Sequence, residues 1–276
     1  MTSGAEPFAL NHMTAPKLRP AEFFALARNL GIDRVEIRND LTGNAILDGT
    51  PAASVREEAQ RAGVEILSIN ALQRFNDWGA ARASEAEELA DYAAGAGAKA
   101  LVLVPRNDGE GRGDHERLPR LIEALQALGP ILSRRGLTGL VEPLGFEICS
   151  LRLKSEAVAA IDAVDGARTF KLVHDTFHHH LAGEAALFPD RTGLVHISGV
   201  DDASVAVGEM RDSHRGLVGA DDRLGNVAQI EALRAGGYAG ALSFEPFAES
   251  IQQMDAKQVQ ARLAASMALI AAGLVS

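Results

Sequence analysis

Short apolar runs alternate with amphipathic segments along the whole chain. Eight runs rich in valine, isoleucine, leucine and phenylalanine have the length and composition of buried strands, at 7–13, 34–38, 64–72, 99–105, 138–145, 168–176, 192–200 and 240–247. Segments with helical spacing follow most of them, at 19–31, 50–63, 84–97, 114–135, 154–164, 226–236 and 255–273. Eight such units in one uninterrupted chain predict an α/β fold, a single (β/α)8 barrel over residues 1–276, because doubly wound sheets typically have fewer strands.

Local signals place some of the element boundaries. Thr50 is a suitable N-cap in front of Pro51, a residue favoured at the first helical position. Ser84 and Glu87 have capping-box spacing, which predicts a helix that begins at 84. The stretch 201–225 has no periodicity. Because long irregular loops in compact domains are usually functional, we expect it to be an active-site loop.

Composition narrows the class of protein. The 276 residues are 47% hydrophobic and include one cysteine, Cys149, which excludes a disulfide framework and a thiolate zinc site. A net charge of −10 disfavours nucleic acid and anionic membranes as partners. No apolar run is long enough to span a bilayer, and residues 1–7 lack the core of an export signal. We therefore expect a cytoplasmic protein with a small-molecule partner, and a homo-oligomer is compatible with the sequence.

Ionisable residues interrupt several strands near their C-terminal ends, where (β/α)8 barrels carry their chemistry. These residues are Glu36, Glu142, Asp175, His196 and Glu245. Burying a carboxylate is costly unless it is paired or binds a metal, and any one of them alone is compatible with a structural ion pair. The last four follow four successive strands. Three carboxylates and an imidazole suit one divalent ion, such as Mn²⁺, Co²⁺, Mg²⁺ or Zn²⁺.

The ordered motifs resemble the xylose-isomerase-like family of sugar isomerases and epimerases. The segments "VEIR", "SINALQRFN", "LVLVP", "LVEPLG", "HDTFHHH", "VHISG" and "SFEPF" cover nearly the whole chain, and the loop "DSHRGLVGADDRLGN" is similar to that of the inosose isomerases. The resemblance implies a metal site formed by Glu142, Asp175, His196 and Glu245. It also implies an isomerase of inositol and carbohydrate metabolism, in which Glu142 and Glu245 transfer a proton through a metal-stabilised enediolate.

Four histidines lie in or beside the "HDTFHHH" segment. The resemblance implies that His178 completes an Asp-x-x-His element and binds a substrate oxygen, and that His180 matches a further pocket histidine. Adjacent residues cannot all point into one pocket, so His179 is expected to face solvent or pack against the protein. His174 precedes the aspartate and is expected to point to the opposite side, as a core histidine.

Other residues are candidates for the substrate pocket. Arg215, in the loop 201–225, is expected from the resemblance to bind a substrate oxygen. Asn70 and Asn76 are expected to form the polar wall for a polyol ring, with Phe75 and Trp78 as its apolar part. Glu36 shares one side of its strand with Arg38. The two side chains either pair with each other or line the pocket.

Two other functions are compatible with the same barrel. An inosose dehydratase or a keto-sugar 3-epimerase also begins with proton abstraction beside a carbonyl, so residue spacing does not separate these reactions. An abasic-site endonuclease resembling the DNA-repair members of this fold needs further histidine ligands, and the strands at 64–72 and 99–105 offer none. A non-enzymatic binding protein would not need four buried metal ligands. The sequence therefore favours a metal-dependent isomerase of a polyol or keto-sugar.

Overall fold

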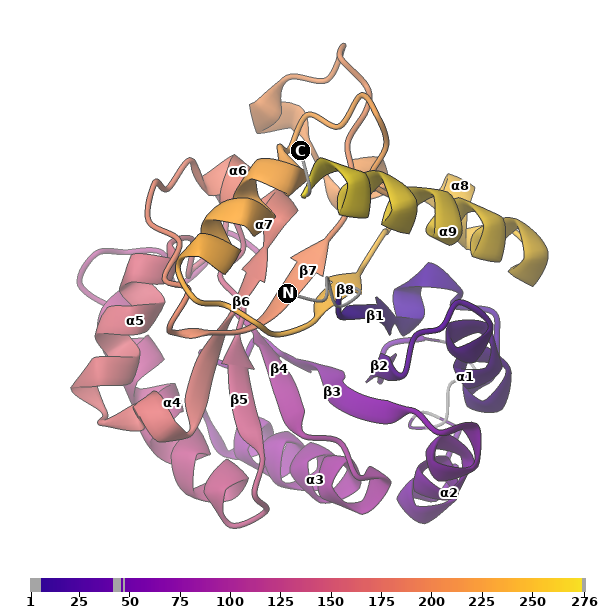
Figure 1. The fold of residues 1–276 in the computed structure, drawn as a ribbon. Coiled ribbons are helices and arrows are strands. Elements are labelled where there is room, and N and C mark those ends of the chain that lie inside the picture. The colour runs from indigo at the N-terminus through magenta and orange to yellow at the C-terminus, as the bar shows by residue number, and fades with distance from the viewer. Residues whose placement is uncertain (1–5, 42–45, 47, 275–276) are drawn as a thin grey trace.

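The computed structural model describes residues 6–41, 46 and 48–274 and shows a closed barrel of eight parallel strands (Figure 1). The strands pair in chain order, and the barrel closes where the first strand pairs with the last. They are β1 (Phe8–Asn11), β2 (Arg34–Arg38), β3 (Glu65–Gln73), β4 (Ala100–Val104), β5 (Thr138–Val141), β6 (Phe170–Asp175), β7 (Thr192–Ile197) and β8 (Leu242–Phe244). All eight coincide with predicted strands, so the predicted fold class is confirmed.

Helices surround the barrel on the outside (Figure 1). They are α1 (Pro20–Asn29), α2 (Ala52–Ala62), α3 (Ala80–Ala96), α4 (Arg117–Ser133), α5 (Lys154–Ala163), α6 (Thr176–Ala182), α7 (Asn226–Ala235), α8 (Glu249–Gln252) and α9 (Ala256–Gly273). Short 3₁₀ helices lie at η1 (His12–Thr14), η2 (Gly166–Arg168), η3 (Val207–Glu209) and η4 (Asp212–His214). Within the described ranges, no helix is long and apolar enough to cross a membrane.

The two-residue period of the strands divides their side chains between two cores. Outward residues, such as Val195 and Ile197 of β7, pack in the large core beneath the helices. Leu194, which precedes Val195, belongs to a smaller cluster that fills the barrel interior with Val102, Leu140 and several alanines. Continuing this alternation to the C-terminal ends of the strands turns the next inward residues toward the mouth of the barrel. His196 is such a residue.

Several helices differ from the expectation. Helix α2 begins at Ala52 with Pro51 as its N-cap residue, so the predicted N-cap at Thr50 is wrong. Helix α3 begins at Ala80, so Ser84 lies inside it, and the predicted capping box is wrong; Gly79 precedes the helix instead. The seven residues of α6 were not predicted, because the segment is short and rich in histidine. Asp175 caps α6 through its side chain, and Gly183 ends it in a left-handed conformation (φ 65°). The expectation about an export signal concerns residues 1–7, of which 1–5 lie outside the described residues.

Candidate active site

Four buried ligand-type residues meet at the C-terminal mouth of the barrel. Asp175 and His196 end β6 and β7 as direct neighbours in the strand register, and Glu142 and Glu245 follow β5 and β8. One potential ligand atom from each of the four lies within 4.8 Å of those of the others. The predicted set is therefore brought together, because each residue continues the inward alternation of its strand.

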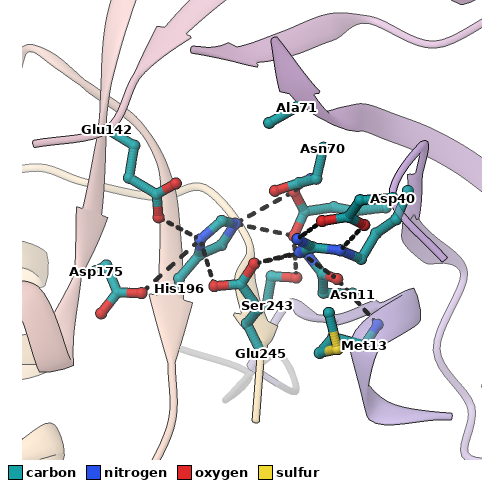
Figure 2. Close-up of polar contacts among 12 residues, drawn as sticks. Asn11, Met13, Asp40, Asn70, Ala71, Glu142, Asp175, His196, Ser243 and Glu245 are labelled. Atoms are coloured by element: carbon teal, nitrogen blue, oxygen red, sulfur yellow. Dashed lines mark hydrogen bonds and ion pairs between the residues drawn. The ribbon is translucent and has the colours of Figure 1, made fainter. Parts of the chain in front are cut away.

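His196 stands at the centre of this cluster, with a carboxylate on each side of its ring (Figure 2). Its Nδ1 lies 3.0 Å from Glu142 Oε1, 3.2 Å from Glu245 Oε2 and 4.0 Å from Asp175 Oδ2. Its Nε2 lies 3.1 Å from Glu36 Oε1, on the side away from the cluster. Glu36 therefore fixes the ring orientation that directs Nδ1 to the other three carboxylates.

Glu36 does not line the cavity over this cluster; the structure places it beneath His196, completely buried. Besides His196, its carboxylate accepts hydrogen bonds from the side chains of Ser68, Asn70 and Ser243. These donors come from β3 and β8, so they hold the carboxylate from two sides. This network compensates the cost of burying Glu36 and makes it a support for the histidine.

Asp175 connects the cluster to the helix that follows it. Its Oδ1 accepts the backbone N–H groups of Phe177 (2.8 Å) and His178 (3.0 Å), which fixes the start of α6. Its Oδ2 accepts a hydrogen bond of 2.6 Å from Nη2 of Arg215. One oxygen therefore organises the helix while the other faces the cluster.

The two glutamates have different surroundings. Glu245 accepts hydrogen bonds from Arg38 (2.7 Å), Asn11 (3.1 Å) and Arg215 (3.0 Å). Burial raises its pKa, but His196 and the two guanidinium groups outweigh burial and hold the pKa below its ordinary value. Burial also raises the pKa of Glu142, and here the net shift is upward even though His196 opposes it. Glu142 thus holds a proton more readily than Glu245 does.

Burial lowers the pKa of His196, but the carboxylates of Glu245, Glu36 and Glu142 outweigh it and raise the pKa well above the ordinary value. The cluster thus favours a positive charge at the centre of its carboxylates. A divalent cation satisfies the same preference. Three buried carboxylates and an Nδ1 that converge within 4.8 Å are a donor set that fits Mn²⁺, Co²⁺, Mg²⁺ or Zn²⁺.

A cavity of about 360 Å³ lies over this cluster. Four of the predicted site residues besides Glu142 line it: Asn70, His178, Arg215 and Glu245. The volume falls within the usual range for small-molecule sites. The cavity therefore offers room for a small substrate beside the two glutamates.

Arg215 and His178 present polar groups to the cavity. Arg215 is 1% exposed, and its guanidinium lies 4.7 Å from the ring centre of Phe247 and 5.1 Å from that of Phe177. This packing holds a buried cation beside the ligand cluster. Nδ1 of His178 is buried and has no hydrogen-bond partner among the described residues. A substrate hydroxyl group can provide that partner.

Some predicted pocket residues lie elsewhere. His180 does not line the cavity; it is half-buried, and Asp222 and Arg223 are the charges that act on its pKa, which burial lowers. Asn76 bonds instead to Ser150 and to the backbone N–H of Arg106.

The neighbours of Asn76 do not form the cavity wall either. Phe75 is completely buried in the large core, and Trp78 packs against that core. Asn76, Phe75 and Trp78 were placed in the pocket because they are close to Asn70 in sequence. The chain turns sharply after β3, so these residues lie away from the cavity.

His174 of β6 and His179 of α6 do not line the cavity, and both pack against the same lysine, as expected of a core histidine and a packed one. Nζ of the buried Lys154 lies 3.0 Å from Nδ1 of His174 and 2.7 Å from Nδ1 of His179. Gln229 completes the contacts of His174 at 2.8 Å. Burial lowers the pKa of Lys154 to about 8 and that of His179 to about 4. This cluster joins α5, β6 and α6 behind the candidate site.

Sequence reasoning did not identify Phe247, Asp40 or Asp212 as cavity residues. Phe247 follows Glu245 by two positions, so strand alternation was an available signal for it. Asp40 follows Arg38 by two positions and binds its guanidinium at 2.7 and 2.8 Å. Arg38 thus pairs with Asp40 and Glu245 and not with Glu36, and it lines the cavity, the other arrangement expected for it.

Comparisons with known proteins agree with this architecture. A family model described as "Xylose isomerase-like TIM barrel" matches residues 24–270. A xylose isomerase domain containing protein from Salmonella typhimurium LT2 is 33% identical, with a TM-score of 0.91 over 100% of both chains. No curated protein matches the chain.

Two further structures share the fold at lower identity. The IolI protein with a bound zinc atom is 20% identical, with a TM-score of 0.86, over 96% of this chain and 98% of that chain. An L-ribulose 3-epimerase is 19% identical, with a TM-score of 0.74, over 98% of this chain and 95% of that chain. Since the family model covers most of a chain that forms the closed eight-stranded barrel, the protein belongs to the xylose isomerase-like TIM-barrel family.

Proposed function

We propose that the protein is a divalent-metal-dependent isomerase of an inosose or a related keto-sugar. The observation that carries the proposal is the buried cluster of Glu142, Asp175, His196 and Glu245 at the floor of a cavity of substrate size. The family match supports sugar isomerase chemistry, and zinc in the IolI structure supports a metal at the floor of such a barrel.

The two glutamates supply the acid and the base. Both lie at the cavity wall, and each has an oxygen within 3.2 Å of the same His196 nitrogen. One carboxylate takes the proton from the carbon that bears a hydroxyl group beside the carbonyl, and the other returns a proton to the former carbonyl carbon. The hydroxyl proton passes to the former carbonyl oxygen, so the product is the ketone shifted by one carbon, formed through an enediolate.

The developing negative charge lies on the former carbonyl oxygen. Arg215 borders the cavity with its N–H groups, and His178 borders it with an unpartnered ring nitrogen. Both are therefore placed to bind substrate oxygens. A divalent ion, when bound, supplies positive charge beside the carbonyl. Asn70, held by its bond to Glu36, offers its remaining amide atoms to a ring hydroxyl.

A 3-epimerase or an inosose dehydratase is the second candidate. The same two carboxylates can remove and return a proton at one carbon, and the L-ribulose 3-epimerase with the same fold supports this alternative. An endonuclease is disfavoured, because the described residues contain a single cluster able to hold a metal ion, whereas the endonucleases of this fold use three zinc ions.

Product analysis in deuterated water tests the proposal. The protein is loaded separately with Mn²⁺, Co²⁺, Mg²⁺ and Zn²⁺ and incubated with a panel of inososes and keto-sugars. An isomerase gives a positional isomer with deuterium at the carbon that receives the proton. An epimerase gives the C3 epimer with deuterium at C3, and a dehydratase gives a product that has lost water.

The variants Glu142→Gln and Glu245→Gln serve as controls, with metal content measured in each. We expect kcat to fall by about 10²–10⁴-fold, the usual contribution of a general acid or base. A metal-loaded protein that leaves the whole panel unchanged would contradict the proposed function. Turnover without solvent deuterium would point to shielded transfer or a hydride shift and would leave the assignment of the two glutamates unsupported.

A further inference from the structure

A second cavity of about 410 Å³ adjoins the metal-site cavity. The two cavities share Asn107, Phe146 and Asp212 in their walls. The rest of the second wall comes from the loop after β5, from α6 and from the loop that contains η3. Because both open at the C-terminal mouth of the barrel, a ligand can extend from one into the other past these three residues.

The wall of the second cavity is largely apolar. Phe146, Ile148, Leu181 and Val207 contribute to it. Ile148 is 50% exposed and Val207 is 41% exposed; within the described ranges, one other large apolar side chain, Leu118 at 41%, is exposed to this degree. Covering such side chains with an apolar group is favourable, so the cavity suits an apolar body.

Two arginines border the same cavity. Arg152 donates to the backbone carbonyls of Gly145 (2.8 Å) and Leu181 (2.9 Å). Arg211 donates to the carbonyls of Gly208 and Met210, at 2.9 and 2.7 Å. Neither guanidinium forms an ion pair in the part of the chain that the structure describes.

Two acidic residues also border the cavity. Asp212 is bound to Arg215 at 3.1 Å, so its charge is already compensated. Glu147 carries the second negative charge, so the four charged side chains of the wall sum to zero. Neither acidic residue forms an ion pair with Arg152 or Arg211 among the described residues, so both guanidinium groups can take an anionic partner. At the junction of the cavities, Oδ1 of Asn107 is buried and has no hydrogen-bond partner among the described residues. It is an acceptor for a donor on the ligand that crosses there.

We propose that the second cavity binds an apolar, anionic substituent of the substrate, whose keto-polyol part occupies the metal-site cavity. The keto-polyol part of this proposal rests on the proposed function. A small molecule is the occupant because 410 Å³ is the size of a small-molecule site, whereas a stable protein interface buries more than about 1,000 Å². Because the two cavities share a wall, we place the keto-polyol and the substituent on one ligand.

The test measures binding of three probes to the purified full-length protein by calorimetry, with and without Zn²⁺. 3-Phenylpropanoate has an apolar body and an anionic group, 3-phenylpropanamide has the body alone, and acetate has the charge alone. We expect 3-phenylpropanoate to bind at least about tenfold more tightly than either control probe, since it engages both the apolar wall and the free guanidinium groups.

Two pairs of variants locate the binding. Val207→Asp is matched by Leu118→Asp, because both side chains are 41% exposed and Leu118 lies on α4, outside the cavity. Arg211→Gln is matched by Arg168→Gln, which removes an exposed arginine at the end of η2. We expect the first variant of each pair to weaken 3-phenylpropanoate binding about tenfold, and the matched variant to leave it unchanged.

Equal binding of the amide and the carboxylate, or equal affinity in both members of each pair, would overturn the proposal. Activity on unsubstituted inososes distinguishes its failure from that of the proposed function. If Val207→Asp abolishes probe binding but leaves inosose turnover intact, both ideas stand. If probe binding follows the expectation while the whole sugar panel is inert, the cavity is retained as a binding site and the isomerase activity is rejected.

Discussion

Replacing Glu36 with glutamine tests how the barrel holds its histidine ligand. The change keeps the size of the side chain but removes the carboxylate that lies 3.1 and 3.2 Å from Nε2 of His196. Glutamine also introduces an N–H₂ group among Ser68, Asn70 and Ser243, which donate hydrogen bonds to Glu36. The amide therefore competes with these donors, and Nε2 of His196 loses a charged acceptor.

The expected effect on metal affinity follows from this geometry. Loss of the outer hydrogen-bond partner of a metal-binding histidine typically weakens metal affinity by about 10–100-fold, or about 1.4–2.7 kcal/mol. We expect Glu36→Gln to fall in this range, because Nδ1 of His196 faces the ligand cluster only while Nε2 is held from below. Circular dichroism and thermal unfolding establish that the variant is folded.

Competition with a Zn²⁺ chelator measures the affinity, and ¹⁵N spectra of the histidine ring report which nitrogen carries the proton. Ser68→Ala is the matched control, because it removes one donor to Glu36 and leaves the contact with His196 in place. We expect the control to bind zinc nearly as the unchanged protein does. A folded Glu36→Gln protein with unchanged affinity and an unchanged His196 tautomer would refute the reasoning.

Three other predictions address the rest of the site. Asp175→Ala should abolish stoichiometric metal binding, and elemental analysis showing one ion per chain in this variant would exclude Asp175 as a ligand. Arg215→Ala and His178→Ala should retain the metal and lower kcat/KM by about 10–1000-fold, the scale for losing one donor to a developing oxyanion; metal loss in His178→Ala would make that histidine a ligand. The pKa of Lys154 falls from 10.5 to about 8 on folding, so the unfolded chain binds more protons between these values and the free energy of unfolding rises with pH there. Lys154→Met should abolish that rise, and urea titrations from pH 7.5 to 10.5 that show equal slopes for both proteins would contradict the burial of a titrating lysine.

The barrel and its four ligand-type residues could be predicted because they depend on short-range patterns. Glu142, Asp175, His196 and Glu245 each interrupt an apolar strand, and a closed parallel barrel brings all such strand ends to one mouth. The order of strands in the barrel is the order in the chain. No long-range pairing had to be guessed.

Contacts that join distant segments could not be predicted in this way. Lys154 meets His174 and His179 across 20 and 25 residues, and no periodicity relates these positions. The family resemblance placed His180 in the pocket, but the turn of α6 directs it elsewhere. That helix was missed because its seven residues are too few for a helical pattern to be distinct.

The seam at which the barrel closes has a consequence for the order in which the molecule can lose its structure. Strand β1 pairs with β8 there, and Asn11 at its end donates to Glu245, beyond the end of β8. Arg38 of β2 donates to the same carboxylate. Fraying of the N-terminal strand would therefore remove one of the donors that hold Glu245, a ligand-type residue from the far end of the chain. Binding of a metal ion at the site and resistance of β1 to fraying are therefore thermodynamically linked. Each stabilises the other through Glu245.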